Sequence, residues 1–202
     1  MTFDLDLVRA QFPALALTDD GCPRMYLDNP AGTQVPQGVI DGMAQCLIES
    51  NANAGGGFRT SDKVDAMLAD AHQAMADLLN AESADEIVFG QNMTTITLHM
   101  SRSIGRLLNK GDEIILSQMD HDGNIGPWLM LAEDLGLVVK WLPFDTETFE
   151  FDLNALDDLL TSKTRLICVG AASNMIGTLN DVRSICSRAK AAGVMTYIDA
   201  VQ

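Results

Sequence analysis

The second half of the chain alternates between short apolar runs and longer stretches whose apolar residues recur at helical spacing. Apolar runs of strand length occupy residues 86–90, 112–117, 137–142, 165–169 and 194–199. The stretches with a helical period cover residues 94–108, 127–135, 152–160 and 182–192. Because buried parallel strands are near-continuously apolar and helices connect them, the pattern predicts an α/β fold. We expect a three-layer sandwich, in which helices cover both faces of a mostly parallel sheet.

Three residues predict where helices begin and end. Asp152 is expected to cap the helix that follows it, because its side-chain oxygens can accept hydrogen bonds from free backbone N–H groups. Gly136 and Gly193 follow two predicted helices and are expected to end them, since glycine adopts the left-handed conformation at little cost.

The first part of the chain has a different pattern. Residues 1–20 predict a short helix and an arm, and residues 35–49 and 61–80 predict two helices with apolar faces. A glycine-rich loop at residues 51–60 separates these two helices. We expect this front segment to pack beside the sheet or on a partner subunit.

Composition narrows the possible partners and compartments. The net charge of -15 argues against nucleic acid and anionic membranes as partners. No apolar stretch approaches the length that spans a bilayer, and the acidic start does not resemble a signal peptide. The four cysteines lie far apart without a CxxC motif, which favours a reduced, cytoplasmic protein.

Polar residues gather in the loops that follow the predicted strands. In a parallel sheet these loops lie at one edge, and open α/β sheets bind their ligands there. The loops in question span residues 90–95, 118–124, 170–178 and 199–202. We therefore expect a functional site at this edge.

Residues 92–95 (Asn-Met-Thr-Thr) open a predicted helix directly after an apolar run. Free N–H groups and the helix dipole at such a terminus suit a phosphate group, and the threonine hydroxyls add donors. An ordinary helix N-cap is the alternative interpretation.

His121 and Asp199 are the most informative single side chains. His121 could be a metal ligand, a base, a ring stacked on a cofactor or a solvated loop residue. A metal would need a second histidine nearby, whereas His72 and His99 fall in helices elsewhere. Asp199 ends an apolar strand, where an unpaired acid is unfavourable, so we expect it to face a cationic group. A structural salt bridge or a helix cap is the alternative for Asp199.

The four loops together match one cofactor. Ser173 and Asn174, with Gly177, form either a polar turn or a substrate clamp. A phosphate site, a flat ring, an amide and a buried acid are what pyridoxal 5'-phosphate needs, because the acid keeps the pyridine nitrogen protonated. A nucleotide-binding domain is a weaker alternative, since no GxGxxG or GxxxxGK follows a strand.

At several motifs the sequence resembles the class V aminotransferase family of fold-type I pyridoxal phosphate enzymes, and within it the cysteine desulfurase-like branch. The resemblance implies the large domain of these enzymes for residues 26–202 and an N-terminal arm for residues 1–25. The matching stretches are Val8 to Pro13, Tyr26 to Gln34, Ile87 to Phe89, Asp112 to Ser117, Met119 to His121, Asn124 with Pro127-Trp128, Ser173-Asn174 with Gly177-Thr178, and Asp199 with Gln202.

The resemblance also implies roles toward the cofactor. Asp199 would pair with the pyridine nitrogen, Gln202 would hydrogen-bond the phenolic oxygen and His121 would stack on the ring. Thr94 would contact the phosphate, and Met93 would contribute only its backbone.

Four further residues are implied on the substrate side. Asn174 would meet the substrate carboxylate or a cofactor oxygen, and Ala31 and Gly32 would line the substrate. Desulfurases carry a His-Arg pair and a further histidine in the glycine-rich loop, where this chain has Gly55-Gly56 and Arg59. Arg59 stays a candidate for binding a carboxylate, across a dimer, and the substrate amino acid stays open.

The resemblance places the Schiff-base lysine and the desulfurase cysteine beyond residue 202. We therefore expect the amino-terminal half of a homodimeric transferase or lyase, which acts on an amino acid through an external aldimine, and a chain that is inactive alone. The alternative is a non-catalytic fragment or a degenerate homologue without the lysine. None of the lysines present lies in the four loops; they are Lys63, Lys110, Lys140, Lys163 and Lys190.

Overall fold

The computed structural model describes residues 3–27, 29 and 32–202. The chain forms two compact units, Met1–Phe89 and Gly90–Gln202.

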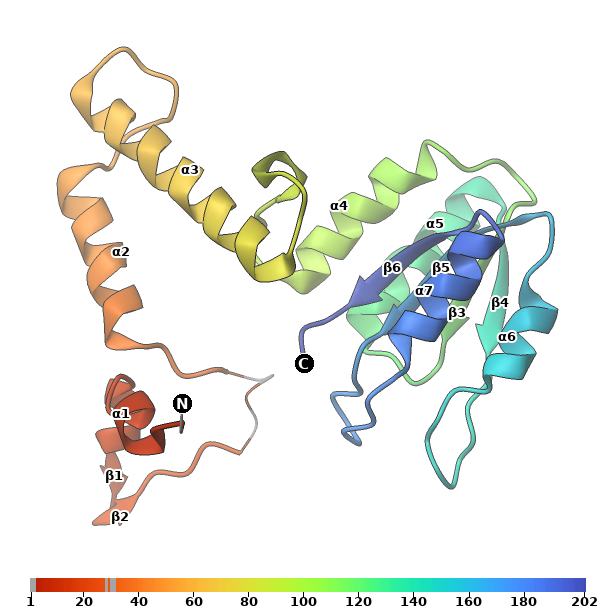
Figure 1. Ribbon diagram of the computed structural model, residues 1–202, viewed down its shortest axis with the longest axis horizontal. Coiled ribbons are helices and arrows are strands. Elements are labelled where there is room, and N and C mark those ends of the chain that lie inside the picture. Colours follow the sequence, from red (N-terminus) through yellow and green to blue (C-terminus); the bar gives the residue numbers. More distant parts are fainter. Residues whose placement is uncertain (1–2, 28, 30–31) are drawn as a thin grey trace. The chain divides into compact units, whose positions relative to one another are not determined.

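The second unit is built on a four-stranded sheet (Figure 1). Its strands are β3 (Glu113–Ser117), β4 (Val138–Leu142), β5 (Thr164–Gly170) and β6 (Met195–Asp199), in the order β4-β3-β5-β6. All three pairings are parallel, with a register shift between β3 and β5 at Glu113. The predicted parallel sheet and α/β class are thus confirmed.

Helices cover both faces of this sheet (Figure 1). One core joins the sheet to α4 (Met93–Gly105) and α5 (Gly126–Leu135), and the other joins it to α6 (Leu153–Leu159) and α7 (Val182–Ala191). The first core comprises Leu108, Ile114, Leu116, Trp128, Leu131, Ala132, Leu166 and Cys168. The second comprises Ile115, Leu142, Leu156, Ile167, Val169, Ile185, Ala189 and Val194. Neighbouring residues of β3 and β5 fall into different cores because a strand points alternate side chains to opposite faces.

The local signals for helix ends are confirmed. The Asp152 carboxylate accepts from the backbone N–H groups of Asn154 and Ala155, at 2.9 and 3.1 Å. Gly136 and Gly193 have φ angles of 69° and 70°, so each follows its helix in the left-handed conformation.

The first unit contains the two long helices that the sequence predicts, α2 (Gln37–Glu49) and α3 (Arg59–Leu79). The glycine-rich loop is tied to the start of α3, because the Ser61 hydroxyl accepts from Gly56 N–H and donates to the Asn53 carbonyl. The remaining elements are α1 (Leu5–Arg9), the short 3-10 helices η1 (Pro13–Ala16) and η2 (Ala84–Glu86), and the hairpin of β1 (Thr18–Asp19) with β2 (Cys22–Pro23). None of the described helices is long and apolar enough to cross a bilayer.

The predicted strand at residues 86–90 is wrong. Ala84–Glu86 forms η2, and the residues that follow form no strand. Val88 and Phe89 are 75% and 51% exposed. A strand needs a neighbour for its backbone hydrogen bonds, and no described residue pairs with this segment. An apolar run therefore predicts a strand only where the fold supplies a partner.

Candidate functional site

The amino terminus of α4 combines a helix cap with free donors. The Asn92 side chain accepts from Thr95 N–H at 2.9 Å, and the Asn92 carbonyl accepts from Ile96 N–H at 3.0 Å. The N-cap interpretation is therefore confirmed. Among the described residues, nothing accepts from the N–H groups of Met93 and Thr94. These two donors remain available to an anion at the positive end of the helix dipole.

Three of the predicted site residues meet around Gly123. A Cβ atom at Gly123 would lie 2.9 Å from Thr94 Oγ1, 3.0 Å from His121 Nδ1 and 3.2 Å from Met93 Sδ. No side chain fits at this position without displacing one of these atoms. The loop after β3 and the start of α4 therefore converge, although no strand of the sheet leads directly into α4.

The ring of His121 is held by its own loop. Gly123 N–H donates to His121 Nδ1 at 3.0 Å, where the short 3-10 helix η3 (Asp122–Asn124) begins. A ring nitrogen that accepts a hydrogen bond carries no proton, so the neutral ring has its proton on Nε2. His121 itself is exposed, which leaves its ring accessible to a ligand.

Asp199 ends β6 and lies opposite Gly170 of β5 in the parallel register. Its Oδ1 accepts from Val201 N–H at 3.0 Å, and no lysine or arginine among the described residues forms an ion pair with it. The salt-bridge interpretation of this acid therefore finds no support in the described part of the chain. The carboxylate retains acceptor capacity for a cationic group.

Asp120 is a feature of this edge that the sequence did not reveal. Its Oδ2 is buried and has no hydrogen-bond partner in the described part of the chain, and Asn124 donates weakly to its Oδ1 at 3.5 Å. Burial raises the pKa of Asp120 to about 6, and the negative charge of Asp199 adds to the increase. Gly170 leaves room for this carboxyl, because a Cβ there would lie 2.6 Å from Asp120 Oδ1. The sequence signal for Asp120 was that an acidic residue follows shortly after an apolar strand.

Asn174 and Gln202 belong to the same unit, and both are exposed. The loop of Asn174 is the polar turn that the sequence allowed. In it the Ser173 hydroxyl accepts from Met175 and Ile176 N–H at 3.3 and 3.4 Å. No described residue hydrogen-bonds the side chain of Asn174 or Gln202, so their roles stay predictions.

The other predicted substrate residues belong to the first unit of the chain. Arg59 begins α3 and Gly32 lies in a preceding loop, and both are exposed residues of the first unit. Ala31 lies outside the described residues.

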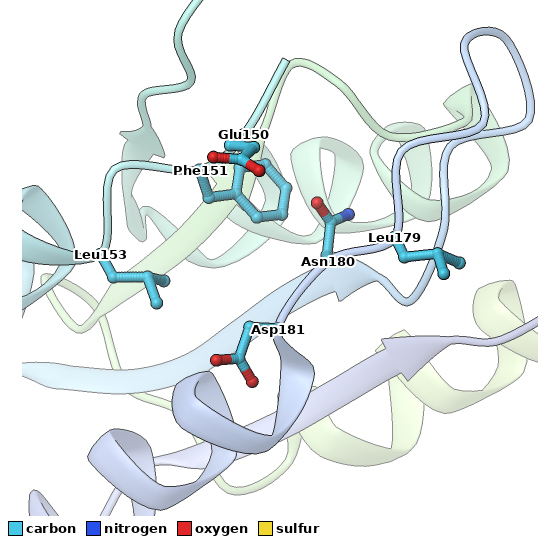
Figure 2. Close-up of a pocket in the computed structure, with 6 residues that line it drawn as sticks. All are labelled: Glu150, Phe151, Leu153, Leu179, Asn180 and Asp181. Carbon is cyan, nitrogen blue, oxygen red and sulfur yellow. The ribbon is translucent and has the colours of Figure 1, made fainter. Parts of the chain in front are cut away.

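A separate surface pocket of about 200 Å³ contains none of the predicted site residues (Figure 2). Asp181 caps α7 there by accepting from Ser184 N–H at 3.0 Å. Asn180 donates to the Gly170 carbonyl at 2.9 Å, so this loop is anchored to the end of β5. The pocket is lined by Glu150, Phe151, Leu153, Leu179, Asn180 and Asp181.

The model of the Aminotransferase class-V family matches residues 25–202. The chain belongs to the class V aminotransferase family. The predicted family is therefore confirmed, and cysteine desulfurases and class V aminotransferases depend on pyridoxal phosphate.

Relatives and solved structures agree with this assignment. A cysteine desulfurase of Yersinia pestis (strain Pestoides F) is 37% identical over 204 residues, which cover 100% of this chain and 50% of the relative. The chain thus spans about half the length of the curated relatives that it matches. The Escherichia coli cysteine desulfurase CsdA is similar in structure, with a TM-score of 0.85 and 30% identity over 100% of this chain and 50% of that chain.

A C-DES mutant with glycine covalently linked to its PLP cofactor shares the fold. Its TM-score is 0.80 at 21% identity, over 96% of this chain and 49% of that chain.

Proposed function

We propose that this chain provides the cofactor-binding residues of a pyridoxal phosphate enzyme that acts on the amino group of an amino acid, as the cysteine desulfurases do. One observation carries the proposal. A helix terminus with free N–H donors and a histidine whose Nδ1 accepts a hydrogen bond meet at the carboxyl edge of the sheet, where β6 ends in an acid that has no ion-pair partner among the described residues.

The residues present fit the phosphate group of this cofactor. The N–H groups of Met93 and Thr94 would donate to it, and the Thr94 hydroxyl adds a third donor. Because Gly123 leaves no side chain between Thr94 and His121, a phosphate and a flat ring can lie next to each other here.

The residues fit the ring as well. Asp199 would hold the proton on the pyridine nitrogen, and His121 would present its ring face to the cofactor. When bound, the cofactor withdraws electrons from the amino acid carbon that reacts. Gln202 would hydrogen-bond the phenolic oxygen, and Asn174 would bind a cofactor oxygen or the substrate carboxylate.

For the whole protein we propose a cytoplasmic homodimer, in which residues 1–25 form an arm and residues 26–202 belong to the large domain. Ala31 and Gly32 would line the substrate, and Arg59 would bind its carboxylate. The family match from residue 25 onward supports the large domain, and the unpaired cysteines support a reducing compartment.

The cofactor proposal is tested by titrating the 202-residue chain with pyridoxine 5'-phosphate, which has the ring and the phosphate but no aldehyde. We expect saturable binding, which Asp199→Asn weakens by roughly tenfold or more because a hydrogen bond to a charged group is lost. Asp158→Asn, an exposed acid on α6, is the matched control and should bind like the wild type. Absence of binding, or equal affinity of D199N and wild type, would overturn the proposal.

The reaction class is tested on the full-length protein. Amine-release and sulfide-release assays over a panel of amino acids separate transamination or elimination from desulfuration. In the 202-residue chain, borohydride should trap no stoichiometric pyridoxal phosphate adduct on any one lysine, because none of its lysines lies in a loop of the carboxyl edge.

A further inference from the structure

A hydrogen bond between two side chains connects α4 to β6. The Tyr197 hydroxyl lies 3.0 Å from Thr97 Oγ1. Thr97 Oγ1 also donates to the Met93 carbonyl at 3.0 Å, which uses its single hydrogen. The Tyr197 hydroxyl is therefore the donor to Thr97, and a continuous chain of hydrogen bonds leads from β6 to the first residue of α4.

Both ends of this contact are held in place by packing. Thr97 is fully buried, and the Tyr197 ring packs edge-on against the fully buried Trp128, with 5.0 Å between ring centroids. Trp128 in turn donates to Asn124 Oδ1 at 3.3 Å. Burial raises the pKa of Tyr197, although its bond to Thr97 opposes that rise, so the phenol stays protonated at neutral pH.

The contact joins the two anchors of the candidate site. Tyr197 and Asp199 are two residues apart on β6, so they point to the same face of the sheet. Thr97 and Met93 are four residues apart on α4, so they share one helix face. A shift of α4 along β6 would change the distance between the phosphate-binding N–H groups and Asp199.

We propose that the Tyr197–Thr97 hydrogen bond positions the start of α4 relative to Asp199, and thereby fixes the spacing that a phosphate ester of an aromatic nitrogen heterocycle must span. This inference rests on the proposed function. Tyr197 and Thr97 are positioning residues that need not touch the ligand. A ligand that contacts both anchors depends on their spacing, whereas a ligand that contacts one anchor does not.

The experiment compares three ligands of the 202-residue chain by NMR titration: pyridoxine 5'-phosphate, pyridoxine and inorganic phosphate. Tyr197→Phe keeps the ring against Trp128 and removes only the hydroxyl. We expect its dissociation constant for pyridoxine 5'-phosphate to rise about fivefold, which corresponds to about 1 kcal/mol, the usual contribution of one hydrogen bond. The constants for pyridoxine and for phosphate should stay within about twofold of the wild type.

Companion variants distinguish a loss of positioning from a general destabilisation of the fold. Thr97→Val should give the same loss, the double variant should lose no more than either single one, and Thr97→Ser should restore affinity because it keeps the hydroxyl. Tyr26→Phe is the matched control, since its hydroxyl bonds the Ala14 carbonyl at 3.2 Å in the other unit. If Y197F does not fold, T97V against T97S provides the same comparison.

Three outcomes would overturn the inference. Equal affinity of Y197F and wild type for pyridoxine 5'-phosphate would do so while leaving the proposed function intact. An equal loss for all three ligands would show a merely structural role. A wild-type chain that does not bind pyridoxine 5'-phosphate would overturn both proposals.

Discussion

At the amino edge of the sheet, the Glu113 carboxylate accepts from Lys140 at 2.8 Å and from the Thr161 and Thr164 hydroxyls at 2.6 and 3.1 Å. These partners, Lys140 foremost, lower the pKa of Glu113. At the carboxyl edge, one buried oxygen of Asp120 has no hydrogen-bond partner among residues 3–27, 29 and 32–202, and burial raises the pKa of this carboxyl to about 6.

The two edges therefore differ in whether their acidic side chains have hydrogen-bonding and charged partners. At the amino edge the charge is paired, which is what stability requires of a half-buried acid. Unpaired acids with a raised pKa are found preferentially at functional sites, because a ligand can supply the missing partner. The difference favours the carboxyl edge as the binding edge.

The largest expected effect is a pH dependence of the free energy of unfolding that comes from Asp120. Because folding raises its pKa from 3.8 to about 6, the native state holds this proton more tightly, and its contribution to stability is lost as pH rises from about 4 to 6. The loss is at most about 3 kcal/mol, from about 1.4 kcal/mol per pKa unit. Urea unfolding of wild type and Asp120→Asn from pH 4 to 7 measures it. With rising pH the wild type should lose free energy of unfolding relative to Asp120→Asn. A difference between the two proteins that does not change with pH would contradict the raised pKa of Asp120.

A smaller change in the free energy of unfolding is expected at the amino edge, where Glu113 is paired with Lys140. Lys140→Met leaves Glu113 half-buried with only the two hydroxyls, so the free energy of unfolding should fall by about 1–3 kcal/mol. Adding Glu113→Gln should recover part of this loss, because it removes the unpaired charge. Lys163→Met changes an exposed lysine without an ion pair among the described residues and should stay within about 0.5 kcal/mol of wild type. A K140M variant as stable as K163M would show that the pairing contributes nothing.

The sequence predicted this sheet well where the signal is local. The predicted strand at residues 112–117 is an apolar run, and the observed strand β3 covers Glu113–Ser117. The run at 86–90 carried a similar signal but forms no strand, because pairing depends on a neighbour that a local pattern cannot specify. Local periodicity thus located β3 to β6 and failed where a long-range partner decides.

The site was predictable to a similar extent. Asp199 and His121 were recognisable because each sits in a distinctive local context at the end of a strand. Asp120 and Tyr197 were not, since their importance comes from Gly170 and Thr97, residues distant in the sequence. Supporting contacts of this kind arise from the packing of elements and leave no motif in the sequence.

The smallest expected effect concerns Asn92, and it distinguishes the capping of α4 from the binding of phosphate at the same helix terminus. Asn92→Ala removes the cap on Thr95 N–H, so stability should fall by about 1 kcal/mol. Asp152→Ala, which removes the cap of α6, should cost a similar amount and serves as the matched control. The affinity for pyridoxine 5'-phosphate should change less than about twofold in both variants, because the Met93 and Thr94 N–H groups do not depend on either side chain. A tenfold loss in N92A alone would mean that the cap itself shapes the phosphate site, and the carboxyl edge would then combine stability and binding in the same residue.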